Sequence, residues 1–235
     1  MALKHRKSWL TACTLVAIAV GVGWTFAQPG TNQNQSPAPV NLLPQEALLF
    51  VTTDGSLAHR DAWEQTAAYQ AIEESGLEAM FEKVIDGFHQ LAAAQGAGGF
   101  VSLGRTALIH LRDHGLSLAA TVVPQQNGPP TGYAILVLHD AARFEETVAQ
   151  LIMGGTQGEL DFQQADKAGR TVTFAVIPDS PGVEVGWWQE SGHLVLVAGI
   201  QAVDSAIAVA TGEAPNATTH PLYQKYVAGE HDFEV

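Results

Sequence analysis

Cysteine is nearly absent from this sequence: the only one is Cys13, which lies in an N-terminal segment that we expect to be removed. The mature chain then has no cysteine, which excludes disulfide bonds, thiol catalysis and cysteine-ligated metal. Charged residues are also scarce, at 15% of the chain against 46% apolar residues. This balance indicates a globular protein that buries a core in one domain or at most two.

Basic residues are the scarcer charged type. The 235 residues include 11 Lys and Arg against 24 Asp and Glu, a net charge of -13. Removal of Lys4, Arg6 and Lys7 with the N-terminal segment leaves 8 basic against 24 acidic residues, a net charge of -16. The remaining basic residues are scattered singly, so no stripe exists that could neutralise a run of phosphates. Nucleic acid and anionic membrane surfaces are therefore disfavoured as partners.

The first 27 residues predict an export signal. A basic stretch, Lys4–Lys7, precedes an apolar run over residues 9–26, and the small residue Ala27 stands at the expected cleavage position. We therefore expect residues 1–27 to be a cleaved signal peptide and the mature protein to be periplasmic or in the cell envelope. The alternative is an uncleaved anchor over residues 9–26, because about 18 apolar residues can just span a bilayer. Membrane contact is expected only through this segment, if it is retained.

Residues 28–42 predict a flexible linker, because they carry no charge and are rich in Pro, Asn, Gln and Ser. Residues 43–235 are expected to form one α+β domain. Apolar runs between turn residues predict strands, and a period of 3.6 residues predicts helices. The expected strands are 47–53, 116–122, 133–138, 160–164, 170–177, 183–189 and 193–198. The expected helices are 61–74, 77–91, 105–113, 141–153 and 201–210.

The connections between these elements predict how they are arranged. The hairpin loops are too short for parallel crossovers, so we expect a mainly antiparallel sheet with the helices packed on one face. Gly115 is expected to end the helix 105–113 in a left-handed conformation. The last residues, Asp232–Val235, have the composition of the start of another strand. We therefore expect the domain to be incomplete at its C-terminus.

Several segments together resemble an exported bacterial family that is common in planctomycete-type bacteria and is described only as a domain of unknown function. They are Leu43-Pro44 before a strand, the pair of helices, the hairpin followed by a helix, Gly192–Val197 before another helix, and His220-Pro221-Leu222-Tyr223. The resemblance spans roughly residues 42–226 in pattern and includes no catalytic signature. It implies an envelope location and no particular chemistry. Members of such a family look longer than this chain, which suggests a truncated copy.

His110 and His114 are the candidates for a metal site. They lie four residues apart, so on a helix they share one face, as two zinc ligands would. The glutamate of the H-E-x-x-H protease motif is absent, with Leu111 in its place. A third ligand would have to come from a distant histidine: His59, His89, His139, His193, His220 or His231. The competing interpretation is a helix C-terminus, where Arg112 and His114 favour the negative end of the helix dipole.

Other catalytic signatures are missing. The nearest approach to a Gly-x-Ser-x-Gly nucleophile turn, Gly99–Gly104, has the first spacing wrong. The glycine-rich stretches 95–99 and 154–158 lack the Gly-Lys-Ser/Thr of a phosphate loop. Asp140, which follows His139 ahead of a helix, is expected to be an N-cap. We therefore predict no catalytic residue and no cofactor site other than the zinc alternative.

Trp187 and Trp188 are adjacent on a predicted strand, so their rings point to opposite faces of the sheet. One ring is expected in the core, and Trp188 is the candidate for binding a partner or a sugar. The sequence thus favours an exported, non-enzymatic binding or structural module whose partner is an unidentified envelope protein or glycan. The alternative is a zinc-dependent enzyme or metal-binding protein that uses His110 and His114.

Overall fold

The computed structural model describes residues 38–76, 83, 86, 90, 98–122, 131–156, 159–178 and 180–226. The predicted signal segment 1–27 and most of the predicted helix 77–91 lie outside these residues. The strands are β1 (Leu49–Thr53), β2 (Leu116–Ala120), β3 (Tyr133–Leu138), β4 (Gln163–Lys167), β5 (Arg170–Val176), β6 (Val183–Glu190) and β7 (His193–Ile200). The α-helices are α2 (Arg60–Glu64), α3 (Ala67–Ser75), α5 (Gly98–His114), α6 (Glu145–Gly155), α7 (Ala202–Thr211) and α8 (Pro221–Tyr226). Short 3-10 helices are η1 (Pro39–Leu42), η2 (Leu57–His59), η3 (Ala142–Phe144) and η4 (Ala217–Thr219).

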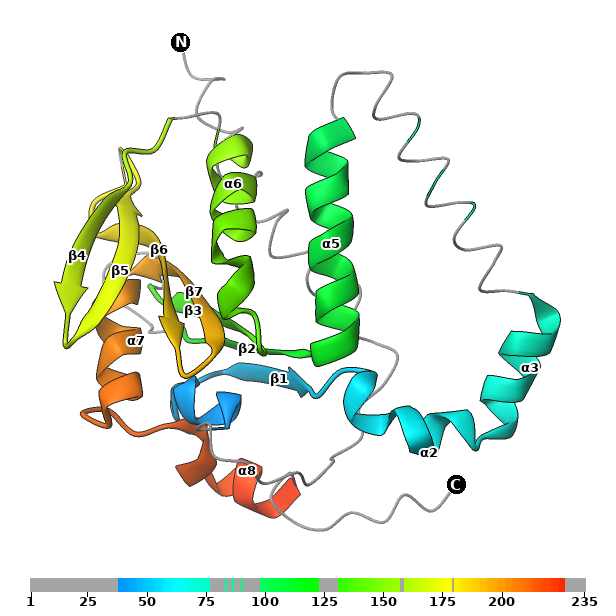
Figure 1. The fold of residues 1–235 in the computed structure, drawn as a ribbon. Coiled ribbons are helices and arrows are strands. Elements are labelled where there is room, and N and C mark those ends of the chain that lie inside the picture. Colours follow the sequence, from blue (N-terminus) through cyan, green and yellow to red (C-terminus); the bar gives the residue numbers. More distant parts are fainter. Residues whose placement is uncertain are drawn as a thin grey trace.

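The described strands form one sheet in the order β1-β2-β3-β7-β6-β5-β4. Every neighbouring pair is antiparallel, as the short connections predict. The last strand in the sequence, β7, therefore lies in the middle of the sheet, between β3 and β6 (Figure 1). The α+β class and the antiparallel sheet are confirmed.

The helices cover both faces of the sheet, whereas the sequence predicted only one. Helices α5 and α6 lie side by side on one face, and α7 lies on the other (Figure 1). The reason is that β3 and β7 are almost continuously apolar, so both of their faces exclude water. Consecutive residues of β6 show the division, because Trp187 packs with Val148 of α6 and Trp188 packs in the core that contains Val203 of α7.

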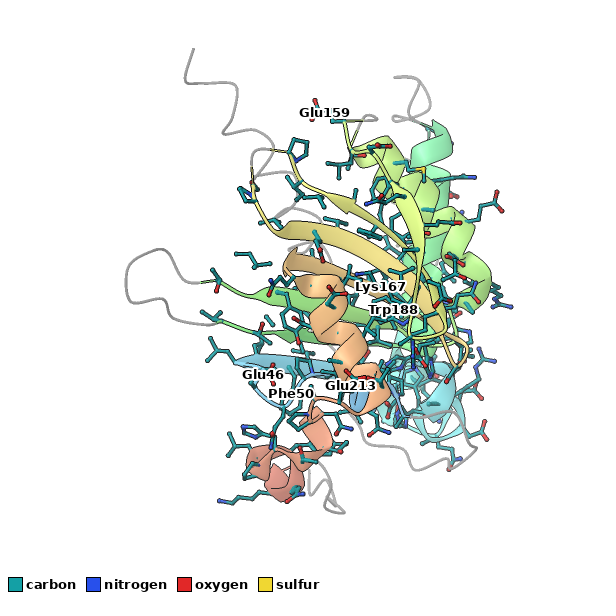
Figure 2. All side chains as sticks on the ribbon, turned by 90° about the vertical axis from the view of Figure 1, so that its left-hand side faces the viewer. Glu46, Phe50, Glu159, Lys167, Trp188 and Glu213 are labelled. Atoms are coloured by element: carbon teal, nitrogen blue, oxygen red, sulfur yellow. The ribbon has the colours of Figure 1, made fainter. Side chains whose placement is uncertain are left out.

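The face covered by α7 holds the larger core. Val172, Val195 and Val197 of the sheet are buried there with Ala206 and Val203 of the helix. Burying a side chain of the size of valine stabilises the fold by about 1.5 kcal/mol or more. Figure 2 looks onto this face, with α7 crossing in front of the strands and Trp188 among them. The helix is also tied to the edge strand β4 by an ion pair between Lys167 Nζ and Asp204 Oδ1, 2.5 Å apart.

Several element boundaries differ from the predicted ones, and the predicted helix 61–74 is divided into α2 and α3. Helix α5 begins at Gly98 and not at residue 105, so it includes glycines that were expected to break it. Pro39–Leu42, assigned to the linker by composition, form η1, and Val40 and Leu42 are buried in the α7-side core. The packed part of the chain therefore begins before Leu43. Among the described helices, none is long and apolar enough to cross a membrane.

Gly115 ends α5 as predicted. Its φ of +84° is left-handed, a conformation that glycine adopts without steric strain. A Cβ at this position would lie 1.9 Å from the carbonyl oxygen of Thr53, so the backbone of β1 approaches α5 closely here. The residue that stops the helix thus also brings the end of α5 against the sheet, next to the histidines discussed below.

Candidate functional site

The tight turn at His139 and Asp140 follows β3 and organises a cluster of polar side chains. Asp140 has a left-handed φ of 49°, an unusual conformation that aspartate tolerates better than most residues. Its backbone N–H donates to Nδ1 of His193, 3.1 Å away on the neighbouring strand β7. The predicted N-cap role of Asp140 is wrong. The helical segment begins two residues later, at Ala142, with Ala141 as its N-cap and no side-chain capping bond.

His139 is buried and belongs to a chain of side-chain hydrogen bonds. Its Nε2 lies 2.9 Å from Oγ of Ser117 on β2, and that Oγ lies 2.7 Å from Oγ1 of Thr52 on β1. The rings of His139 and His193 meet edge to face, with centroids 5.8 Å apart. Ser117 is 0% exposed, so in this conformation no substrate reaches the serine–histidine pair. The arrangement links three strands and gives no nucleophile.

His110 and His114 lie on one face of α5, as their spacing predicts. Nε2 of the buried His110 donates to the carbonyl oxygen of His139, 2.8 Å away. The His114 ring stacks on the His110 ring with centroids 4.3 Å apart, and its Nδ1 lies 3.4 Å from Oδ2 of Asp140. The fold thus gathers His110, His114, His139 and His193, which we call the histidine cluster.

Burial lowers the pKa of two members of the histidine cluster, His139 and His110. Desolvation lowers the pKa of His139 from 6.5 to about 4, with a further lowering by the neighbouring His193. Desolvation also lowers the pKa of His110. Both rings are therefore neutral at pH 7, and a neutral His110 can donate only one N–H, the one used by the carbonyl of His139.

The cluster does not have the geometry of a preformed metal site. The His110 and His114 rings lie 19° from parallel, so their nitrogens do not converge on one point. No group of three or more His, Cys, Asp or Glu with suitable geometry occurs among the described residues. The zinc alternative stays a prediction.

Metal analysis of the purified protein tests that alternative. A zinc ion held by His110 and His114 requires about one zinc per chain, lost on His110→Ala. Because no group of three or more possible ligands with suitable geometry occurs among the described residues, we expect the wild type to contain no more zinc than His110→Ala. His220→Ala, outside the histidine cluster, is the matched control. Stoichiometric zinc that disappears only in the His110 variant would establish the metal site.

The tryptophan pair is placed differently from the prediction. Trp188 is 0% exposed, and its Nε1 donates to Oε2 of Glu190, 3.1 Å away, so its ring offers no surface to a partner in this structure. The ring on the opposite face, Trp187, is 2% exposed and packs against Phe162 with centroids 5.0 Å apart. Of the two, it is Trp187 that borders a hollow of the surface.

This hollow, which we call the α6 hollow, lies between α6 and strands β4–β6 and has a volume of about 300 Å³. Its lining includes Glu145, Glu146 and Met153 from α6, and Gln164, Thr173 and Trp187 from the sheet. None of the residues that line it is basic. The α6 hollow is therefore a polar, acidic depression with an aromatic side chain in its wall.

The polar groups of the α6 hollow are only partly engaged within the protein. Gln189 Nε2 donates to Glu145 Oε2, and Gln164 Nε2 donates to Thr173 Oγ1 at 3.3 Å. Glu146, which is exposed, makes no hydrogen bond or ion pair with the described residues.

Sequence reasoning found His110 and His114 but missed the α6 hollow. In the sequence, Glu145 and Glu146 have the appearance of acidic residues in the first turn of a helix. Carboxylates at that position are stabilised by the positive end of the helix dipole, so the two residues gave no sign of a site. Gln164 and Thr173 fall on separate strands, with no local motif to join them. The pairing of Gln164 with Thr173 across β4 and β5 is what brings them to one site.

Comparison with known proteins finds no match for this chain among protein-family models, curated proteins or solved structures. The resemblance to an exported family of unknown function stays a prediction.

Proposed function

We propose that this chain is a non-enzymatic binding module of the cell envelope, and that it binds its ligand in the α6 hollow. The observation that carries the proposal is the α6 hollow itself, a depression of about 300 Å³ with Glu145, Glu146 and Trp187 in its lining. The export signal predicted for residues 1–27 supports the envelope location. The residues with the greatest potential for catalysis, Ser117 and His139, are buried and bonded to each other, which supports binding over catalysis.

Site-specific photo-crosslinking in the exporting host tests the proposal. A benzophenone amino acid is introduced at Met153, on the wall of the α6 hollow, and separately at Val176 on β5. The two positions are matched because Met153 is 45% exposed and Val176 is 47% exposed. We expect an adduct from position 153, found in the envelope fraction, and none from position 176. Equal labelling at both positions, no adduct at either, or recovery of the protein in the cytosol would contradict the proposal.

A further inference from the structure

The two edge strands of the sheet, β1 and β4, differ in how well they are protected against pairing with another chain (Figure 1). An edge strand presents a row of unpaired backbone N–H and C=O groups, and natural proteins usually block such an edge with charged side chains. Strand β4 follows this rule, because its sequence is QQADK and Lys167 forms an ion pair with Asp204 of α7. Strand β1 has the sequence LFVTT and carries no charged side chain.

Strand β1 also exposes apolar side chains. Leu49 is 53% exposed and Val51 is 38% exposed, and Leu48, just before the strand, is 78% exposed. Among the described strands, β1 pairs with β2 alone, so one side of its backbone has no partner strand there. An apolar, uncharged edge of this kind favours the addition of a further strand.

The sequence of β1 is suited to pairing with a second copy of itself. In an antiparallel pair of copies centred on Val51, this residue lies opposite itself, and Leu49 lies opposite Thr53. No like charges meet along the strand, although the whole chain carries a net charge of -13. Leu49 and Val51 share one face of β1, so the apolar side chains of the two copies become neighbours across the new pair.

The charges just beyond the ends of β1 are complementary in the same pairing. Glu46 of one copy comes opposite Ser56 of the other, and Arg60 begins α2 shortly after Ser56. Glu46 and Arg60 are both exposed, and neither makes a hydrogen bond or ion pair with the described residues. The two-fold axis repeats the arrangement, so two pairs of Glu46 with Arg60 can form across the joint. This complementarity favours a second copy over an unrelated peptide.

We infer that this chain forms a two-fold dimer through its β1 strands, which join the two sheets edge to edge with Val51 at the axis. The inference goes beyond the proposed function and does not depend on it. The α6 hollow lies beside β4–β6 in the other half of the sheet, so pairing through β1 leaves it accessible. The dimer should be weak, because a contact centred on one strand of five residues is at the low end of interface sizes.

Sedimentation equilibrium of the purified full chain tests the inference, at about 100 µM so that a weak dimer is populated. We expect the wild type to have twice the mass of one chain. Val51→Lys should raise the Kd of the dimer about tenfold, because two like charges then lie opposite each other, and Val51→Glu should do the same. The matched control is Val176→Lys, which changes a valine of similar exposure on the interior strand β5 and should keep the wild-type Kd.

A mixture of the two Val51 variants makes the test specific for this pairing. Opposite charges then lie at the axis, so native mass spectra of the mixture, with one variant labelled with ¹⁵N, should show a dimer that contains one copy of each. The mixture also controls for folding, since two unfolded variants would not restore each other. Failure of the two variants to pair, while circular dichroism shows both to be folded, would exclude the β1 joint.

The complementary charges supply a second, independent variant. Glu46→Arg should raise the Kd about tenfold, and the addition of Arg60→Glu to it should restore the dimer. A wild type that is monomeric at the concentration used would overturn the inference and leave an extended foreign peptide as the alternative occupant of the edge. A dimer unaffected by Val51→Lys or by Glu46→Arg forms through another surface, which would also overturn it.

Discussion

Replacing Trp188 by alanine is expected to lower the free energy of unfolding by about 3–5 kcal/mol. The indole is completely buried between the sheet and α7, so its removal leaves a large cavity in the larger core. Its Nε1 also donates to Glu190, whose carboxylate accepts from the Arg170 guanidinium on β5. Arg170 in turn donates to the carbonyl of Ala210 in α7. The substitution therefore affects a polar connection between two strands and a helix as well as the packing.

Urea unfolding followed by circular dichroism measures this effect. Trp188→Phe keeps most of the buried area and should recover the larger part of the loss. Val176→Ala, at an exposed position of β5, should change the free energy of unfolding by less than about 0.5 kcal/mol. If Trp188→Ala unfolds at the same urea concentration as the wild type, the described core is wrong. A loss of ligand binding in Trp188→Ala would reflect this instability, so Trp188 is a poor choice for testing a binding role.

Stability should fall as the pH is lowered from about 6.5 to about 4, and His139 should carry much of the loss. Its pKa is about 4 in the folded protein because the ring is buried, and close to 6.5 in the unfolded chain. Between these values the unfolded chain binds a proton that the folded protein does not. Unfolding is therefore favoured progressively across this window, by about 3 kcal/mol in total for this residue. The lowered pKa of His110 acts in the same direction.

Comparison of variants isolates the contribution of His139 from that of the carboxylates. The free energy of unfolding is measured at pH 7, 6, 5 and 4.5 for the wild type and for His139→Gln, which cannot titrate. The wild type should lose more stability than the variant over this range. His220→Gln, just before α8 and outside the histidine cluster, is the matched control. The same slope in His139→Gln as in the wild type would show that protonation of this ring does not limit acid stability.

Strand positions were predictable because hairpin-connected strands carry their signal locally. Every described strand overlaps a predicted one, and the largest displacement is that of β4, predicted at 160–164 and found at Gln163–Lys167. The prediction followed the apolar Phe162, whose ring instead packs against Trp187 just before the strand. The polar residues that form β4 lack an apolar alternation because this strand is at the edge of the sheet.

The start of α5 was not predictable from local propensity. Glycine disfavours helix by about 1 kcal/mol relative to alanine, so Gly98 and Gly99 argued for a break. The helix nevertheless begins at Gly98, and its C-terminal part packs through Leu111 into the core that contains Val148 of α6. Tertiary contacts of this kind are not visible in a window of sequence.

The sites were predictable in part. The spacing of His110 and His114 correctly placed both on one helical face. The contact between these two residues and the other half of the histidine cluster depends on the order of the strands. His139 follows β3 and His193 begins β7, so the two rings are neighbours only because β7 pairs with β3. Alternation on β6 showed that the two tryptophans face opposite ways. Which of them borders a hollow depends on where α6 lies, and no local pattern encodes that.

The central position of β7 has a consequence for the order of events in folding. Residues 49–138 supply one half of the sheet and residues 163–190 supply the other, and only β7 joins them. A nascent polypeptide whose residues 193–200 have not yet emerged holds two unconnected half-sheets with bare edges. The sheet can thus be completed only after residues 193–200 have been synthesised, when β7 pairs with β3 on one side and with β6 on the other.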